Sequence, residues 1–262
     1  MVMNITILKI GGNIINNPAA LHEALDYFAE LPEPAVLVHG GGRKASQVIS
    51  EMGRQPVMID GRRITDAATL EIVTMVYAGL LNKTVVAKLQ ARGCNAIGLS
   101  GADGNAVLAE KRPVKDIDYG YAGDVRSVNA PLLEQLLRGG LRPVLCPITH
   151  DQKGQLLNTN ADTIANETAR ALAAAGFGVS LRYCFELPGV MEDINDPTSL
   201  IRELTPDRYA DYRSQGIIAG GMIPKLDNAF AAVAAGVREV IIGDLPALRA
   251  GSGTRVLAEP DV

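Results

Sequence analysis

Two lysines that each lie beside a pair of glycines are the residues of this sequence best suited to chemistry. Lys9 comes just before Gly11-Gly12, and Lys225 follows Gly220-Gly221. Asp162 stands at the expected start of a helix. Phosphoryl transfer needs positioning and charge neutralisation more than covalent help from the protein. A lysine on each side of the transferred group would offset the charge that spreads over its oxygens, so these residues indicate phosphoryl transfer.

A third glycine-rich segment predicts an anion site. The apolar run Val36–Val38 leads through His39 into Gly40-Gly41-Gly42, and apolar residues at helical spacing follow as far as Gly53. This order predicts a strand, a tight loop and a helix, whose first N–H groups are free to bind an anion. Glycines let the backbone approach a ligand closely. A plain strand-to-helix turn is the alternative, but three consecutive glycines exceed what a turn needs.

The first glycine pair follows the same pattern. The run from Ile5 to Ile10 predicts a strand that ends in glycines, and Asn17-Pro18 predicts the start of the next helix. A lysine in an apolar strand is commonly an edge residue that faces solvent. Lys9, however, stands where a parallel strand delivers its carboxyl end to a ligand crevice, so we expect a functional role.

Strands alternate with helices along the rest of the chain. This alternation predicts an α/β fold, a three-layer αβα sandwich in which helices cover both faces of a mostly parallel sheet. A change in composition near Gly176–Gly178 predicts two lobes, residues 1–175 and 176–262. The polar, turn-rich stretch from Lys111 to Asp124 predicts a hairpin or a mobile lid.

Composition excludes several classes of protein. The 262 residues carry a net charge of −4 with 4% aromatic residues and no Trp, so nothing suggests a nucleic-acid surface. Three cysteines without paired spacing suggest a reducing compartment, and no metal site built from side chains is expected. We find no signal sequence and no apolar run near the ~18 residues of a membrane span, and therefore expect a soluble, cytoplasmic protein.

Other motifs were tested against the same glycines. The segment Gly40–Ala45 satisfies the dinucleotide fingerprint G-x-G-x-x-A, with Asp60 about twenty residues further on, which keeps a nicotinamide-dependent oxidoreductase open. That fingerprint is short and leaves the Lys9 loop unexplained. No Gly-Lys dipeptide occurs, which excludes a Walker-type loop, and three histidines make His-based catalysis a poor expectation.

Six segments in order resemble the amino acid kinase family and, within it, the enzymes that phosphorylate N-acetylglutamate in arginine biosynthesis. The resemblance covers nearly the whole chain. Each segment is short, but their order makes the set specific. They are Lys9–Gly12, His39–Gly42, Gly61–Asp66, Leu157–Asp162, Gly220–Lys225 and Gly253–Val256.

The resemblance implies a role for each matching residue. Lys9 and Lys225 would be the two transition-state lysines, and Asp162 would organise them. The acylated glutamate would lie on Gly41 and Gly42, with its α-carboxylate against Arg63 and Asn158. ATP, with Mg²⁺, would bind the C-terminal lobe and react at the γ-carboxylate to give an acyl phosphate. The nucleotide would contact Gly11, Gly12, Glu186, Gly189, Ile217 and Ala219.

Two departures from the family pattern carry expectations. The family has Asp where this chain has Glu186, within Cys184–Gly189, so the adenosine contacts are expected to differ. The sequence also shows no extension before its first strand, which in the family accompanies arginine-inhibited hexamers. We therefore expect a homodimer with little feedback inhibition. Its interface would be the helix Asp66–Leu81, because that helix is apolar on more than one side.

The acyl group and the activity leave alternatives open. N-succinyl-glutamate is an alternative substrate, because a basic side chain could pair with a succinyl carboxylate. Ordinary surface charge is the other explanation of such residues. A non-catalytic sensor of ATP or amino acid is a further alternative, disfavoured by the intact Lys9, Asp162 and Lys225. The basic candidates are Arg43, Lys44, Arg62 and Lys111.

Overall fold

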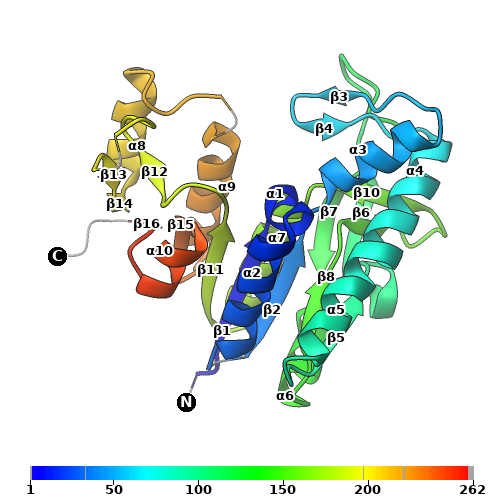
Figure 1. Ribbon diagram of the computed structural model, residues 1–262, viewed down its shortest axis with the longest axis horizontal. Coiled ribbons are helices and arrows are strands. Elements are labelled where there is room, and N and C mark those ends of the chain that lie inside the picture. Colours follow the sequence, from blue (N-terminus) through cyan, green and yellow to red (C-terminus); the bar gives the residue numbers. More distant parts are fainter. Residues whose placement is uncertain (1, 33, 197, 221, 259–262) are drawn as a thin grey trace.

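The computed structural model describes residues 2–32, 34–196, 198–220 and 222–258, and its centre is an eight-stranded sheet (Figure 1). All neighbouring strands pair parallel except β15 and β16, so the predicted α/β class and mostly parallel sheet are confirmed. In order across the sheet the strands are β14 (Glu203–Leu204), β16 (Thr254–Val256), β15 (Glu239–Gly243), β11 (Gly178–Cys184), β1 (Asn4–Ile10), β2 (Ala35–His39), β8 (Arg142–Leu145) and β5 (Ala96–Leu99).

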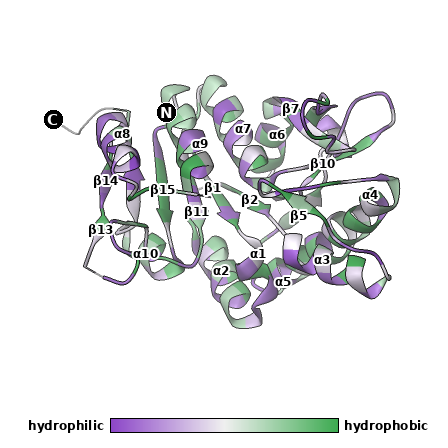
Figure 2. Ribbon diagram, turned by 90° about the horizontal axis from the view of Figure 1, so that it is seen from above, coloured by the Kyte–Doolittle hydropathy of each residue, from purple (hydrophilic) through white to green (hydrophobic). Residues whose placement is uncertain are grey.

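Helices cover both faces of this sheet (Figure 2). Along β1, Ile5 and Ile7 join one buried cluster while Leu8 and Ile10 join another, as the two-residue period of a strand requires. The first cluster lies under α6 (Ala130–Arg138), α7 (Ala161–Ala174) and α9 (Met222–Ala234). The second lies under α1 (Gly12–Asn16), α2 (Pro18–Glu30), α3 (Gly42–Glu51), α5 (Asn82–Gln90) and α10 (Leu245–Ala250). The short α8 (Pro206–Ser214) flanks the sheet edge. The sheet runs unbroken through both predicted lobes, and the boundary at residue 175 stays a prediction.

A small closed sheet and two separate hairpins accompany the central sheet. The closed sheet contains β6 (Val107–Lys111), β7 (Ala122–Val128), β9 (Ile148–His150) and β10 (Leu156–Thr159), and the sequence did not predict it. Because β6 and β7 pair antiparallel, the hairpin predicted over 111–124 is confirmed. The other hairpins are β3 (Met58–Ile59) with β4 (Arg62–Arg63) and β12 (Val190–Met191) with β13 (Leu200–Ile201).

The helix predicted over Asp66–Leu81 is present and extends further, to Gln90. Asp66 caps α4 (Ala67–Thr74) by accepting from the Thr69 N–H at 2.7 Å, and a π-helical segment, η1 (Met75–Leu81), continues without a break into α5. By length and composition Ala67–Gln90 could span a membrane, and 39% of its most apolar window is buried in the fold. That differs from our expectation, but a core helix meets the same test, so no membrane location follows.

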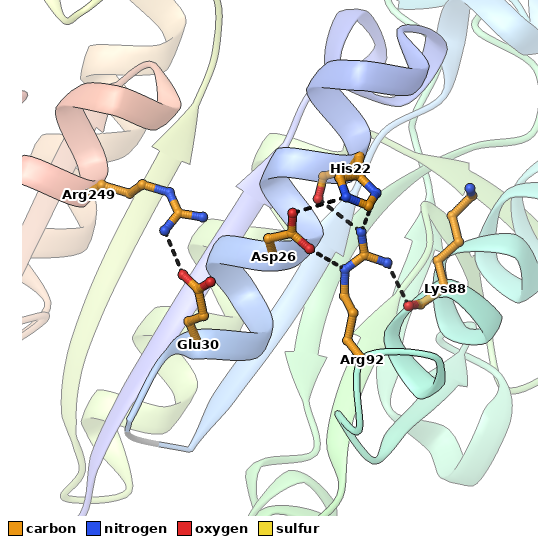
Figure 3. Close-up of polar contacts among 6 residues, drawn as sticks. All are labelled: His22, Asp26, Glu30, Lys88, Arg92 and Arg249. Carbon is orange, nitrogen blue, oxygen red and sulfur yellow. Dashed lines mark hydrogen bonds and ion pairs between the residues drawn. The ribbon is translucent and has the colours of Figure 1, made fainter.

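Helix α2 is anchored on two sides by ion pairs (Figure 3). Nε of Arg92, just beyond α5, lies 2.7 Å from Oδ1 of Asp26, and Nη1 of Arg249 on α10 lies 2.6 Å from Oε2 of Glu30. Exposed pairs of this kind contribute little free energy. They tie α2, which packs against α1, to the end of α5 and to α10.

Candidate active site

Two glycine turns meet where β1 and β2 end. The Gly40 N–H donates to the Ile10 carbonyl at 3.0 Å, which ties the second turn to the first. A Cβ added to Gly12 would lie 3.6 to 3.9 Å from the backbone nitrogens of Gly41, Gly42 and Arg43. Three amide nitrogens at the start of α3 therefore converge beside Gly12, as an anion-binding helix N-terminus requires.

Lys9 reaches this junction from β1 and is held by an ion pair. The residue is 9% exposed, and its Nζ lies 2.6 Å from Oδ1 of Asp162. Asp162 stands in the first turn of α7, where Asn160 caps the helix by accepting from the Asp162 N–H at 2.7 Å. The positive end of the helix dipole stabilises a carboxylate there. A charged lysine is thus positioned beside the converging amides.

A cavity of about 560 Å³ brings the two lysines together from opposite ends of the chain. Nζ of Lys225, on α9, lies 5.3 Å from the ring centroid of Phe185. The volume is in the range of small-molecule and cofactor sites. The predicted residues that line this cavity are Lys9, Gly11, Gly12, Gly42, Arg63, Asp162, Glu186 and Lys225.

A smaller cavity of about 160 Å³ adjoins the first, since Gly42 and Arg63 line both. Arg63 is 6% exposed, and its Nη2 donates to the Gly42 carbonyl at 2.9 Å and to Ser46 Oγ at 2.8 Å. Nε and Nη1 of Arg63 are buried without a hydrogen-bond partner. Unpaired buried N–H groups of a cation are costly. A guanidinium in that state is suited to a carboxylate ligand.

Asn158 lines the same small cavity from β10, as predicted. Its Nδ2 donates to Thr65 Oγ1 at 3.0 Å, and Thr65 Oγ1 donates to the Arg63 carbonyl at 2.9 Å. The two residues assigned to the α-carboxylate are therefore joined through one threonine. Gly41, also predicted, lines this cavity too.

Tyr77 is a lining residue that sequence reasoning missed. It belongs to the π-helical segment η1, and burial raises the pKa of its phenol while the nearby Arg63 charge opposes the rise. The phenol is consequently neutral. Tyr77 lies on the apolar stripe of the predicted helix, so its pattern was that of a core residue, and no sequence signal separated it from the stripe.

The nucleotide residues divide into two groups. Glu186 accepts a hydrogen bond from Asn13 Nδ2 and lines the large cavity, as do Gly11 and Gly12. The other three do not line it. A Cβ on Gly189 would lie 2.5 Å from atoms of Leu200 and Thr254, the Ile217 N–H donates to the Tyr212 carbonyl, and Ala219 is exposed. Their contact with a nucleotide stays a prediction, and Gly221 lies outside the described residues.

The basic residues considered for a succinyl group, and Asp60, lie in different surroundings. Arg62 lines the small cavity and Arg43 the large one, whereas Lys44 donates to Gln47 and Lys111 lies over the Tyr121 ring. Asp60 occupies the β3–β4 turn with φ of 48°. It does not follow a parallel strand beside the glycine loop, so the geometry of the dinucleotide fingerprint is absent.

Neither histidine catalysis nor a metal cluster is supported by the described residues. Complete burial lowers the pKa of His39 from 6.5 to about 4, so its ring is neutral and shut off from the cavities. Within residues 2–258, apart from 33, 197 and 221, no group of three or more His, Cys, Asp or Glu side chains could hold a metal ion. Positive charge at the site comes from the two lysines and from the arginines that line the cavities, Arg43, Arg62 and Arg63.

The chain is similar to known acetylglutamate kinases over most of its length. An acetylglutamate kinase of Phocaeicola vulgatus is 53% identical over 254 residues, covering 97% of this chain and 98% of that protein. One of Cytophaga hutchinsonii is 56% identical over 237 residues, covering 90% and 89%.

Solved structures share the fold. The smu.665 protein of Streptococcus mutans superposes with a TM-score of 0.80 at 28% identity, covering 97% of this chain and 99% of the other. A carbamate kinase of Giardia lamblia bound to AMP-PNP has a TM-score of 0.66 at 14% identity, covering 98% of this chain and 99% of the other. At that identity the similarity supports the fold alone. The family model described as "Amino acid kinase family" matches residues 4–244. The chain therefore belongs to the amino acid kinase family.

Proposed function

We propose that this protein phosphorylates the γ-carboxylate of N-acetyl-L-glutamate with ATP, a step of arginine biosynthesis. Relatives 51–56% identical over most of their length are acetylglutamate kinases. The observation that carries the proposal is the buried, half-unpaired Arg63 between two adjoining cavities. A carboxylate bound to Arg63 would lie beside the cavity that the two lysines line, which supports the proposal.

The proposed reaction forms one bond and breaks one. A γ-carboxylate oxygen attacks the γ-phosphorus of ATP, and the bond from that phosphorus to the β,γ-bridging oxygen breaks to release ADP. The carboxylate is already ionised at neutral pH, so no base is required. Lys9 and Lys225 neutralise charge on the phosphoryl oxygens, and Asp162 holds Lys9 in place. The N–H groups of Gly41 and Gly42 supply further donors.

Magnesium enters this proposal with the nucleotide. Mg²⁺ is commonly held by substrate phosphates, waters and one or two carboxylates. Among the described residues that line the large cavity, Asp162 and Glu186 carry carboxylates, which fits such an ion. Bound there, it would neutralise phosphate charge.

N-succinyl-L-glutamate is a second candidate substrate, favoured by Arg62. This arginine lines the small cavity, and no ion pair is formed by it among the described residues. Burial and the neighbouring Arg112 lower the pKa of Arg62. A second carboxylate on the acyl group would offset both effects.

We further propose a cytoplasmic homodimer built on the long helix. Met75 and Leu80 of η1 are 56% and 50% exposed, which leaves apolar surface on the face predicted to meet a second subunit. In this arrangement the N-terminal 175 residues hold the acyl-glutamate and the dimer contact, and residues 176–262 hold ATP.

Trapping of the product tests the reaction. The protein is incubated with ATP, Mg²⁺ and hydroxylamine, with N-acetyl- and N-succinyl-glutamate in parallel, and hydroxamate is measured. Hydroxamate with N-acetyl-glutamate supports the proposal, and hydroxamate with the succinyl compound alone supports the second candidate. ATP binding without hydroxamate from either would favour a sensor and refute both.

A further inference from the structure

A row of polar side chains, buried at His39 and Asn82, runs behind the second glycine turn, and its members line neither cavity. Its members come from the π-helical junction and the strand ends. Asn82 is 1% exposed and His39 is 0% exposed. A Cβ on Gly98 would lie 1.9 Å from Asn82 Oδ1, so β5 carries a glycine where this amide needs room. Buried polar side chains of β2 and α5 thus meet at one site, for which a glycine of β5 leaves room.

Each hydrogen bond in this row of side chains determines which atom donates in the next one. Lys83 Nζ donates to Asn82 Oδ1 at 3.2 Å, and Asn82 Nδ2 donates to the Val144 carbonyl at 2.9 Å. An ammonium only donates and a carbonyl only accepts, so the orientation of the Asn82 amide is settled. Its Nδ2 lies 3.2 Å from His39 Nε2. That ring nitrogen must therefore accept, and the ring proton must be on Nδ1.

The proton on Nδ1 orients a peptide of the glycine turn. His39 Nδ1 lies 2.8 Å from the Gly40 carbonyl oxygen and donates to it. The peptide bond is planar and trans, so its N–H points opposite to its carbonyl. With the Gly40 carbonyl drawn inward to His39, the Gly41 N–H points away from His39. Its nitrogen is one of the three that converge beside Gly12, which lines the large cavity of the two lysines.

The π-helical segment presses on the same turn from the other side. Gly41 has φ of 156°, and a Cβ there would lie 2.4 Å from Leu81 Cδ1 and 3.1 Å from ring atoms of Tyr77. Leu81 and Asn82 are consecutive, so one turn of helix contacts both Gly41 and His39. Segments of π-helix are frequent at functional sites.

We propose that His39, held in its Nδ1-protonated form by Asn82, is a positioning residue that aims the Gly41 N–H at the transferring phosphoryl group. This inference rests on the proposed phosphorylation. His39 touches no reactant, and its effect passes through one backbone peptide. Aimed amides stabilise the charge of a transition state more than that of the ground state, so the effect belongs to kcat rather than to KM.

Two substitutions at His39 test the roles of its two ring nitrogens separately. An asparagine amide reproduces the Nδ1 donor, whereas a glutamine reproduces the Nε2 position and leaves the Gly40 carbonyl without its donor. We expect H39Q to lower kcat on the order of 10²-fold, the effect of losing one such donor, with KM for both substrates near wild type. H39N should recover most of that loss. Leu137→Ala, a substitution of a buried residue on α6 that lines neither cavity, controls for lost stability alone.

The tautomer itself can be read without any turnover. The chain has three histidines, so [¹⁵N]histidine NMR spectra are simple to assign with the H39N variant. We expect one ring protonated at Nδ1 and unprotonated at Nε2, and converted by Asn82→Ala to a mixture. An Nε2-protonated His39, or equal kcat for H39Q and H39N at equal stability, overturns the inference. A wild type that forms no hydroxamate while His39 shows the expected tautomer refutes the proposed function instead.

Discussion

Replacing Lys9 by methionine removes one charge from the site while keeping most of the side-chain volume. The Lys9 side chain is 11% exposed and paired with Asp162 at 2.6 Å. Two unit charges ~4 Å apart at an effective dielectric constant of ~20 interact by about 4 kcal/mol. Because Asp162 already offsets part of the lysine charge, we expect a loss of about 3 kcal/mol from transition-state stabilisation, or roughly 150-fold in kcat.

The cost in folding stability should be smaller than the cost in turnover. Lys9→Met leaves the Asp162 carboxylate without its cation, but that side chain is 19% exposed and lies at the start of α7, where the helix dipole favours it. We expect a loss of about 2 kcal/mol, below the 3–5 kcal/mol typical of a broken buried pair.

The assay is initial-rate formation of hydroxamate at saturating ATP and acyl-glutamate, with thermal unfolding measured on the same samples. Lys88→Met, an exposed lysine on α5, removes the same charge away from the cavities and should keep wild-type turnover. If Lys9→Met retains a third or more of wild-type kcat, or if Lys88→Met loses as much, the role assigned to Lys9 is wrong.

Three further predictions follow from the same contacts. Arg63→Ala should raise the KM for acyl-glutamate by about 10- to 100-fold, because it removes hydrogen bonds to a charged group. Initial-rate kinetics in which only the KM for ATP changes would contradict this. Burial lowers the pKa of His39 from 6.5 to about 4, so the unfolded chain binds a proton first and His39 should cost roughly 3 kcal/mol of stability as pH drops from 6.5 to 4. Urea unfolding should show a fall in stability over this range that is smaller in H39N than in wild type, because the other titrating groups are the same in both. Gly98→Ala places a Cβ 1.9 Å from Asn82 Oδ1. The substitution should lower the free energy of unfolding in urea by about 2 kcal/mol and should also lower kcat. An unchanged unfolding free energy and an unchanged kcat would show that Asn82 can move freely.

The lysines and the glycine turns could be predicted because their signals are local. Lys9 stands beside glycines at a strand end, and carboxyl ends of parallel strands meet at one edge of a sheet. Asn17 was recognised as the start of a helix for the same reason, and its side chain accepts the Ala19 N–H in the structure. The three-layer fold followed from alternating strands and helices.

The missed features depend on contacts between distant segments. His39 and Asn82 are 43 positions apart and meet only because β2 and the long helix pack together. A π-helical segment has the same apolar pattern as an α-helix, so η1 and Tyr77 gave no separate signal. The closed sheet of β6, β7, β9 and β10 has short strands that pair out of chain order, which no periodicity reveals.

Transfer of an oxygen isotope tests most directly that the γ-carboxylate attacks phosphorus. N-acetyl-glutamate labelled with ¹⁸O in its γ-carboxylate is incubated with ATP, Mg²⁺ and the protein, and the acyl phosphate is cleaved by hydroxylamine at its carbonyl carbon. The bridging oxygen then leaves with the phosphate. We predict inorganic phosphate that carries one ¹⁸O per molecule, seen by ³¹P NMR. Phosphate without ¹⁸O would mean that water, and not the substrate, attacks ATP, and would contradict the proposed reaction.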